Sequence, residues 1–235
     1  MKLSAEPAPA PAESAGDGDP AASIGEPRWP IVLVLVVYMA FNIGLRVWLP
    51  GDSVTHVPWL MPAIEALLLV FLLTSDPGHT DRRRLRRIAL VIVIVLVVAA
   101  LWATVVLVYD LIDGRGVSND AAELLASGAV VWLGNILAFS LLYWLIDGSG
   151  PMARMQHPVP VDFAFTQHMS PELAPPGWRP VFLDYLHLGF TNATAFSPTD
   201  VMPLTHRAKY AMLVQSTVAL ALFGLIVARA VNAFT

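Results

Sequence analysis

The strongest constraint on this chain is a series of long apolar segments, separated by short polar loops, between residues 31 and 234. A helix that crosses a hydrocarbon core of roughly 30 Å needs about 20 mostly apolar residues. Hydrophobic residues make up 56% of the sequence and charged residues only 14%, whereas about a quarter of the residues in a soluble domain are charged. The sequence therefore predicts an all-α integral membrane helix bundle.

Six segments are expected to form transmembrane helices, five of them clearly apolar and one ambiguous. Turn signals such as Pro50-Gly51-Asp52 mark their limits. The predicted spans are about 31–49, 59–73, 88–109, 121–146, 181–198 and 208–231. Residues 30–235 then form one transmembrane bundle. Residues 1–29, rich in Pro, Ala and acidic side chains, are predicted to be a disordered tail.

Arginine clustering predicts the orientation of the bundle. Five arginines lie between Arg82 and Arg87, in the loop before the third span. Short loops rich in Lys and Arg stay on the cytoplasmic side. This loop and the N-terminal tail are therefore predicted to be cytoplasmic, and the acidic 110–120 loop is predicted to be outside.

The segment 181–198 admits two paths. A full crossing gives six spans and a cytoplasmic C-terminus, whereas a re-entrant half-helix places the C-terminus outside. The basic residues His206, Arg207 and Lys209 favour re-entry. A full crossing is nevertheless the preferred prediction, because the segment approaches the length of about 20 residues that a span needs and polar residues are tolerated where they face the bundle interior.

The most informative polar residues lie in this ambiguous segment. At intervals of 3, 4 and 3, one helix face carries Asp184, His187, Thr191 and Thr194. The neighbouring stripe carries Tyr185, Leu188 and Asn192. A carboxylate facing lipid costs several kcal/mol, so the first stripe is expected to face protein or water. It is interpreted as the lining of an ion or proton route, with interhelical hydrogen bonding as the alternative.

A second polar pair is predicted within the first two spans. Arg46 lies near the outer end of span one, and Glu65 lies about two turns into span two. Antiparallel neighbours joined by a short loop bring these depths together, and a neutralised pair costs less than two lone charges. A structural ion pair is the favoured interpretation, with a functional carboxylate at Glu65 as the alternative.

Several classes of function find no support in the sequence. The net charge of −4 argues against nucleic-acid binding, which requires a basic face. The chain contains 0 cysteines, which excludes disulfides and thiolate metal sites. Motifs for phosphate binding, zinc hydrolysis or serine hydrolysis are missing. We therefore expect no enzyme activity, no cofactor and no metal.

The last third of the chain resembles a known family. The run Phe182–Thr191, the turn Thr199-Asp200-Val201, the basic Arg207 and the closing Val231-Asn232 resemble an uncharacterised family of bacterial six-span inner-membrane proteins, a domain of unknown function. The resemblance implies a six-helix protein of the bacterial plasma membrane and brings no established activity. The chain departs from the pattern at Thr199 and Gly224.

The same region is similar to the pore helix, filter and inner helix of pore-loop potassium channels. The residues that carry this similarity are Thr194, Asp200, Pro203, Leu204 and Thr205, followed by a long apolar segment. Filter glycines are replaced by Ser197 and Thr199, and Pro198 stands where an aromatic residue is usual. The similarity implies pore-like geometry without a potassium filter of the usual kind.

The combined prediction is a small ion- or proton-conducting membrane protein whose polar stripe lines the route. One chain is small for enclosing a wide aqueous channel, so a homo-oligomer is expected. The expected partners are the lipid bilayer, further copies of the chain and a small ion. The alternative is a non-conducting membrane interaction or regulatory protein whose stripe serves helix packing.

Overall fold

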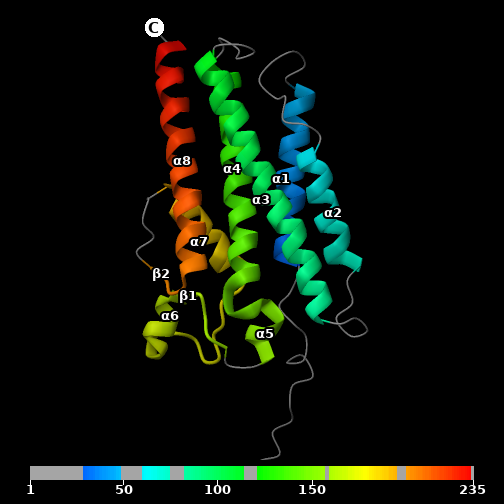
Figure 1. Ribbon diagram of the computed structural model, residues 1–235, viewed down its shortest axis with the longest axis vertical. Coiled ribbons are helices and arrows are strands. Elements are labelled where there is room, and N and C mark those ends of the chain that lie inside the picture. Colours follow the sequence, from blue (N-terminus) through cyan, green and yellow to red (C-terminus); the bar gives the residue numbers. More distant parts are fainter. Residues whose placement is uncertain are drawn as a thin grey trace, which may run out of the picture.

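The computed structural model describes residues 29–48, 60–74, 82–113, 121–156, 159–194 and 200–233 (Figure 1). These residues form a helix bundle with a single short pair of strands, which confirms the all-α class predicted from the sequence. The predicted N-terminal tail lies outside the described residues, apart from Trp29 at the start of the first helix.

The long helices of the described chain form the body of the bundle. They are α1 (Trp29–Trp48), α2 (Leu60–Thr74), α3 (Arg82–Asp113), α4 (Ala121–Ile146) and α8 (His206–Ala233). Among the described residues, three stretches are long and apolar enough to cross a membrane: Arg83–Tyr109, Leu125–Ser149 and His206–Ala228. Shorter apolar stretches, Trp29–Gly44 and Pro62–Thr74, lie in α1 and α2. The chain therefore has the helices of a membrane protein.

Helix α4 lies at the centre of the bundle and contacts α1, α3, α7 and α8. Of the apolar stretch in α4, 67% is buried inside the bundle, compared with 39% of the apolar stretch in α3 and 28% of that in α8. The core around it includes the buried Leu35, Leu68, Leu96, Leu141 and Tyr143. A helix that is apolar all round belongs inside a bundle or a membrane. The outer faces of α3 and α8 thus remain apolar and exposed, as lipid contact requires.

The connection between α4 and α8 gathers at one end of the bundle, the lower end in Figure 1. Its short elements are η2 (Asp147–Ser149), α5 (Pro151–Gln156), β1 (Phe163–Phe165), α6 (Thr166–Met169), η3 (Pro171–Leu173) and β2 (Val201–Pro203). The two strands pair antiparallel, with Phe163 opposite Pro203 and Phe165 opposite Val201. This pairing joins the chain before α7 to the chain after it.

Helix α7 (Phe182–Thr194) has 13 residues, which gives a length of about 20 Å. That is less than a hydrocarbon core of roughly 30 Å. It lies beside the lower half of α4 and α8 (Figure 1). Near its far end, Ala193 packs in a buried cluster with Ile136 and Ala219. Helix α7 therefore ends about half-way along its neighbours.

The path of α7 differs from the preferred prediction for 181–198, in which this segment runs the full height of the bundle. Strands β1 and β2 precede and follow α7 and are hydrogen-bonded to each other, so the chain enters and leaves at the same end. Helix α8 starts at that end and finishes at the opposite one (Figure 1). The β1–β2 pairing therefore holds the two flanks of α7 together at one end of the bundle. This arrangement is the one expected for the re-entrant alternative, and the path of 181–198 relative to a membrane stays a prediction.

Candidate functional site

The predicted polar stripe lies on the outer face of α7. The His187 side chain is 60% exposed, Thr194 is exposed, and Asp184 and Thr191 are half-buried. The residues of α7 that are buried against the bundle are Phe182, Tyr185, Leu188, Gly189, Asn192 and Ala193. The helical spacing brings the four stripe residues to one face as predicted, but that face points away from the bundle.

Three of the four stripe residues have a local hydrogen-bond partner. Asp184 Oδ2 accepts the Val181 N–H at 2.7 Å in the first turn of the helix. The hydroxyl of Thr191 donates to the His187 carbonyl at 2.9 Å, and that of Thr194 donates to the Phe190 carbonyl at 2.9 Å. These hydroxyls therefore add polarity to the surface without tying α7 to another helix.

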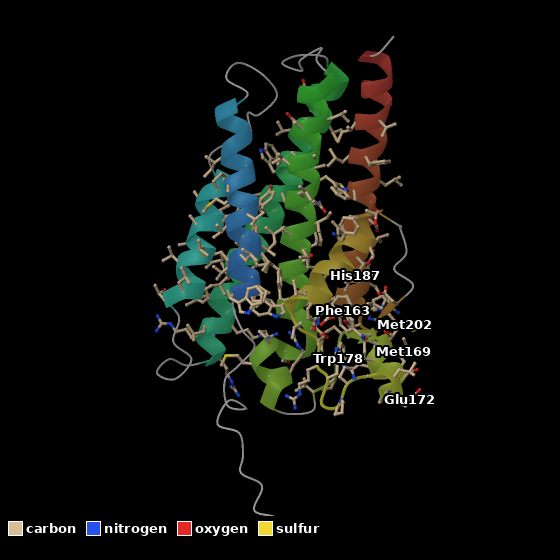
Figure 2. The ribbon with its side chains drawn as sticks, turned by 180° about the vertical axis from the view of Figure 1, so that it is seen from behind. Phe163, Met169, Glu172, Trp178, His187 and Met202 are labelled. Carbon is tan, nitrogen blue, oxygen red and sulfur yellow. The ribbon has the colours of Figure 1, made fainter. Side chains whose placement is uncertain are left out.

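The imidazole of His187 lies beside a carboxylate that follows α7 in the chain. His187 Nε2 is 3.1 Å from Asp200 Oδ2, and the Asp200 side chain is 40% exposed. His187 lies on the side of the molecule seen in Figure 2, above Phe163 and Trp178. The imidazole of His187 is therefore hydrogen-bonded to Asp200 in the folded chain. The sequence pattern missed this contact, because 13 residues separate the two positions.

The inner face of α7 is fixed by a buried amide network shared with α4 and α8. Gln215 Oε1 accepts from the Tyr143 hydroxyl at 2.6 Å and from Asn192 Nδ2 at 2.8 Å. Gln215 Nε2 in turn donates to the Gly189 carbonyl at 2.9 Å. Gln215 is fully buried, and its amide joins α8 to both α4 and α7.

Close approach of α7 to α4 depends on Gly189. A Cβ atom at this position would overlap Ser140 Oγ and lie 3.2 Å from the Ile136 carbonyl oxygen. The Ser140 hydroxyl already donates to that carbonyl at 2.7 Å. A side chain at position 189 therefore requires Ser140 to leave its hydrogen bond or α7 to shift away from α4.

Asp147, which directly follows α4, holds the first turns of α7. It is fully buried. Its Oδ2 accepts the Tyr185 hydroxyl at 2.5 Å, and its Oδ1 accepts the N–H groups of Asp162 at 2.6 Å and Phe163 at 3.2 Å. The turn that aims this carboxylate inward has positive φ at Gly148, Ser149 and Gly150. One side chain thus joins α4, β1 and α7.

Asp162 performs the same task for α8. Arg207 donates to both of its carboxylate oxygens, each at 2.6 Å, and the Thr205 hydroxyl donates to Oδ1 at 2.6 Å. Burial alone raises the pKa of Asp162, but the hydrogen bonds from Arg207 and Thr205 and the charge of Arg207 outweigh it, so the pKa is lowered. The carboxylate form fixes the start of α8 beside β1.

Arg154 binds carbonyl groups at the lower end of α4. Its Nη1 donates to the carbonyl of Trp144 at 2.8 Å and to that of Asp147 at 2.5 Å. Its guanidinium also lies 5.0 Å from the centre of the Tyr185 ring. Unpaired carbonyls at a helix C-terminus favour a cation, so Arg154 stabilises the turn that carries Asp147.

Sequence reasoning missed Asp147, Asp162 and Arg154 as organising residues. In the sequence they lie in a polar loop that matches no motif, and only the folded chain joins them to Tyr185 and Arg207. The one available signal was the set of charged residues between two long apolar segments. The sequence pattern places Tyr185 and Asn192 only on the neighbouring stripe, yet they are the polar residues that α7 buries.

The predicted ion pair in the first two helices is described only in part. Glu65 is buried, with 1% of its surface exposed. The side chain of Arg46 lies outside the described residues. Pairing of Arg46 with Glu65 therefore stays a prediction.

In comparisons with known proteins, no family model, no curated protein and no solved structure matches the chain. The fold defines an all-α bundle with membrane-type helices and a half-length helix held at one end. The two family resemblances of the last third stay predictions.

Proposed function

We propose that this protein is a multi-pass protein of the bacterial plasma membrane that conducts small cations or protons, with its N-terminus in the cytoplasm. Copies assemble so that the outer faces of their α7 helices enclose the route. The observation that carries the proposal is the half-length α7 itself. It enters and leaves at one end of the bundle and turns Asp184, His187, Thr191 and Thr194 outward.

The outward stripe needs polar surroundings. The His187–Asp200 pair is 60% and 40% exposed, and exposure of such groups to hydrocarbon costs several kcal/mol. Within the described residues, none of the four stripe side chains hydrogen-bonds to α4 or α8. Water, or the same face of another copy, provides the polar surroundings that a single chain does not give to the stripe. This is why assembly belongs to the proposal.

The charge of the face favours cations. Asp184 and Asp200 are acidic, and α7 ends at Thr194 about half-way along the bundle. The last carbonyl groups of a helix lack intrahelical partners and carry the negative end of its dipole. Because α7 ends half-way along the bundle, its partial negative charge lies inside the bundle. A crossing helix would end at the edge of the bundle instead.

The order of elements adds support. A long helix (α4), a half-length helix (α7) and a second long helix (α8) follow one another as the outer, pore and inner helices do in pore-loop channels. The direction differs, because the arginines at the start of α3 favour a cytoplasmic entry for α7. Residues 195–199, the counterpart of the filter, lie outside the described residues.

A second candidate is a non-conducting interaction or regulatory protein. The observation that favours it is the amide network of Asn192, Tyr143 and Gln215, which locks α7 against α4 and α8. In this alternative the outward stripe contacts a helix of another membrane protein and conducts nothing.

Flux measurements distinguish the two functions. The purified protein is reconstituted in liposomes, and cation and proton flux are recorded between pH 5 and 8 (about 1.5 units on either side of the usual histidine pKa of 6.5). Asp184→Asn and His187→Ala are expected to reduce the flux, while His206→Ala and Thr217→Ala, exposed positions on α8, leave it unchanged. A flux equal in all four variants contradicts the assigned route, and correctly folded protein without any flux favours the second candidate.

A further inference from the structure

Arg86, near the start of α3, lies against the turn that follows α4. A Cβ atom placed on Gly150 would lie 3.1 Å from Arg86 Nε and 3.3 Å from its Cδ. Gly150 has a φ of 98°, a conformation that residues with a side chain rarely adopt, and the lack of a Cβ leaves room for Arg86. Arg86 as a whole is half-buried, and its Nε is buried.

The charges around Arg86 are mostly of its own sign. Arg207 and Arg154, both positive, act on it together with the single negative charge of Asp162. Asp162 is already engaged by the two hydrogen bonds of Arg207 and by Thr205. Arg86 is therefore the unbalanced cation of this cluster.

The buried Nε of Arg86 also lacks an acceptor in the described chain. The nearby carboxylate of Asp147 is occupied by the Tyr185 hydroxyl and two backbone N–H groups. A half-buried cation beside two other cations is unfavourable unless an anion joins them. The local structure thus calls for a negative group from outside the described chain.

The surroundings of Arg86 indicate which anion this is. Arg83, Arg84 and Arg87 are exposed on the same two turns of α3, and the apolar part of the helix starts at Ile88. Basic clusters beside the apolar part of a membrane helix meet the headgroups of anionic lipids. The planar guanidinium matches phosphate oxygens in a two-point contact.

We propose that Arg86 binds the phosphate group of an anionic phospholipid at the junction of α3 with the Gly150 turn. Arg83, Arg84 and Arg87 attract such lipids less specifically. The ligand is a phosphate monoanion or a phosphate diester. The position of Arg86 beside the apolar part of α3 favours a membrane lipid as its source. This binding is independent of ion conduction.

The test uses the full chain in a neutral sugar-based detergent. Phosphatidylglycerol, phosphatidylcholine and inorganic phosphate are added separately, retained lipid is counted by native mass spectrometry, and thermal unfolding is recorded. The variants are Arg86→Gln and the matched control Arg84→Gln, which removes the same charge from an exposed position.

The wild type is expected to retain phosphatidylglycerol at least about tenfold better than Arg86→Gln, since the variant loses a charge-assisted hydrogen bond to the phosphate. Arg84→Gln is expected to retain it almost as the wild type does. Without added lipid, Arg86→Gln should unfold at a temperature equal to or above that of the wild type, because it removes an unbalanced cation.

The outcomes separate the sources and the roles. Stabilisation by inorganic phosphate equal to that by phosphatidylglycerol, lost in Arg86→Gln, supports the site and assigns it to soluble phosphate. Equal retention of phosphatidylglycerol by Arg86→Gln and the wild type overturns the proposal. A lower unfolding temperature of Arg86→Gln in the absence of lipid also overturns it, because it makes Arg86 a structural residue of the α4 turn.

Discussion

The hydrogen bond between Tyr185 and Asp147 offers the sharpest test of how α7 is held. Tyr185 is fully buried, and its hydroxyl donates to Asp147 Oδ2 at 2.5 Å. Tyr185→Phe removes this bond and keeps the ring, including its contact with the Arg154 guanidinium. A hydrogen bond to a carboxylate is worth about 1.5–3 kcal/mol, and the free energy of unfolding should fall by that amount.

The measurement is equilibrium unfolding in mixed micelles, followed by circular dichroism. Tyr210→Phe is the matched control, because Tyr210 is 65% exposed on α8, and surface changes of this kind stay within about 0.5 kcal/mol. In a double-mutant cycle, Tyr185→Phe and Asp147→Ala should be coupled by at least about 1 kcal/mol. Equal effects of Tyr185→Phe and Tyr210→Phe, or a coupling near zero, refute the claim that Asp147 anchors α7.

Further predictions concern the contacts of α7 and α8. Gly189→Ala should lower the free energy of unfolding by about 1–3 kcal/mol because its methyl group overlaps Ser140, whereas Gly224→Ala, with nothing within 4 Å, should raise it by about 0.5–1 kcal/mol; unfolding curves check both. Asp162 has a lowered pKa in the folded chain, so its stabilisation is present above its unfolded pKa of about 3.9 and is lost as the pH falls through the lower folded value. The unfolding temperature of the wild type should therefore drop below about pH 4 more steeply than that of Asp162→Asn, and parallel curves for the two proteins contradict this role. Gln215→Leu should lower the free energy of unfolding more than Ser216→Ala on the same turn does. The reason is that Gln215→Leu leaves Asn192 and the Tyr143 hydroxyl without their shared acceptor.

The sequence predicted the long helices well because their signal is local. The segment 121–146 has the same limits as α4, and the arginines before the third span mark the start of α3. A long run of apolar residues indicates a membrane helix by itself, whatever the rest of the chain contains.

The candidate site could be predicted only in part. The spacing of Asp184, His187, Thr191 and Thr194 correctly indicated a shared face, but not the direction in which that face points. In a membrane protein both the core and the outside are apolar, so helical periodicity does not separate them as it does in water. The half-length path of α7 depends on the pairing of β1 with β2, which no local pattern encodes.

The central claim is that α7 enters and leaves at the same side of the membrane. Because the chain contains 0 cysteines, single cysteines can be introduced as Glu172→Cys before α7 and Leu204→Cys after it, both at exposed positions. Labelling with a membrane-impermeant maleimide in intact cells and in inverted vesicles reports the side of each. The re-entrant path predicts that both react only in inverted vesicles. Reaction of the two positions from opposite sides would show that the segment crosses the membrane and would contradict this account.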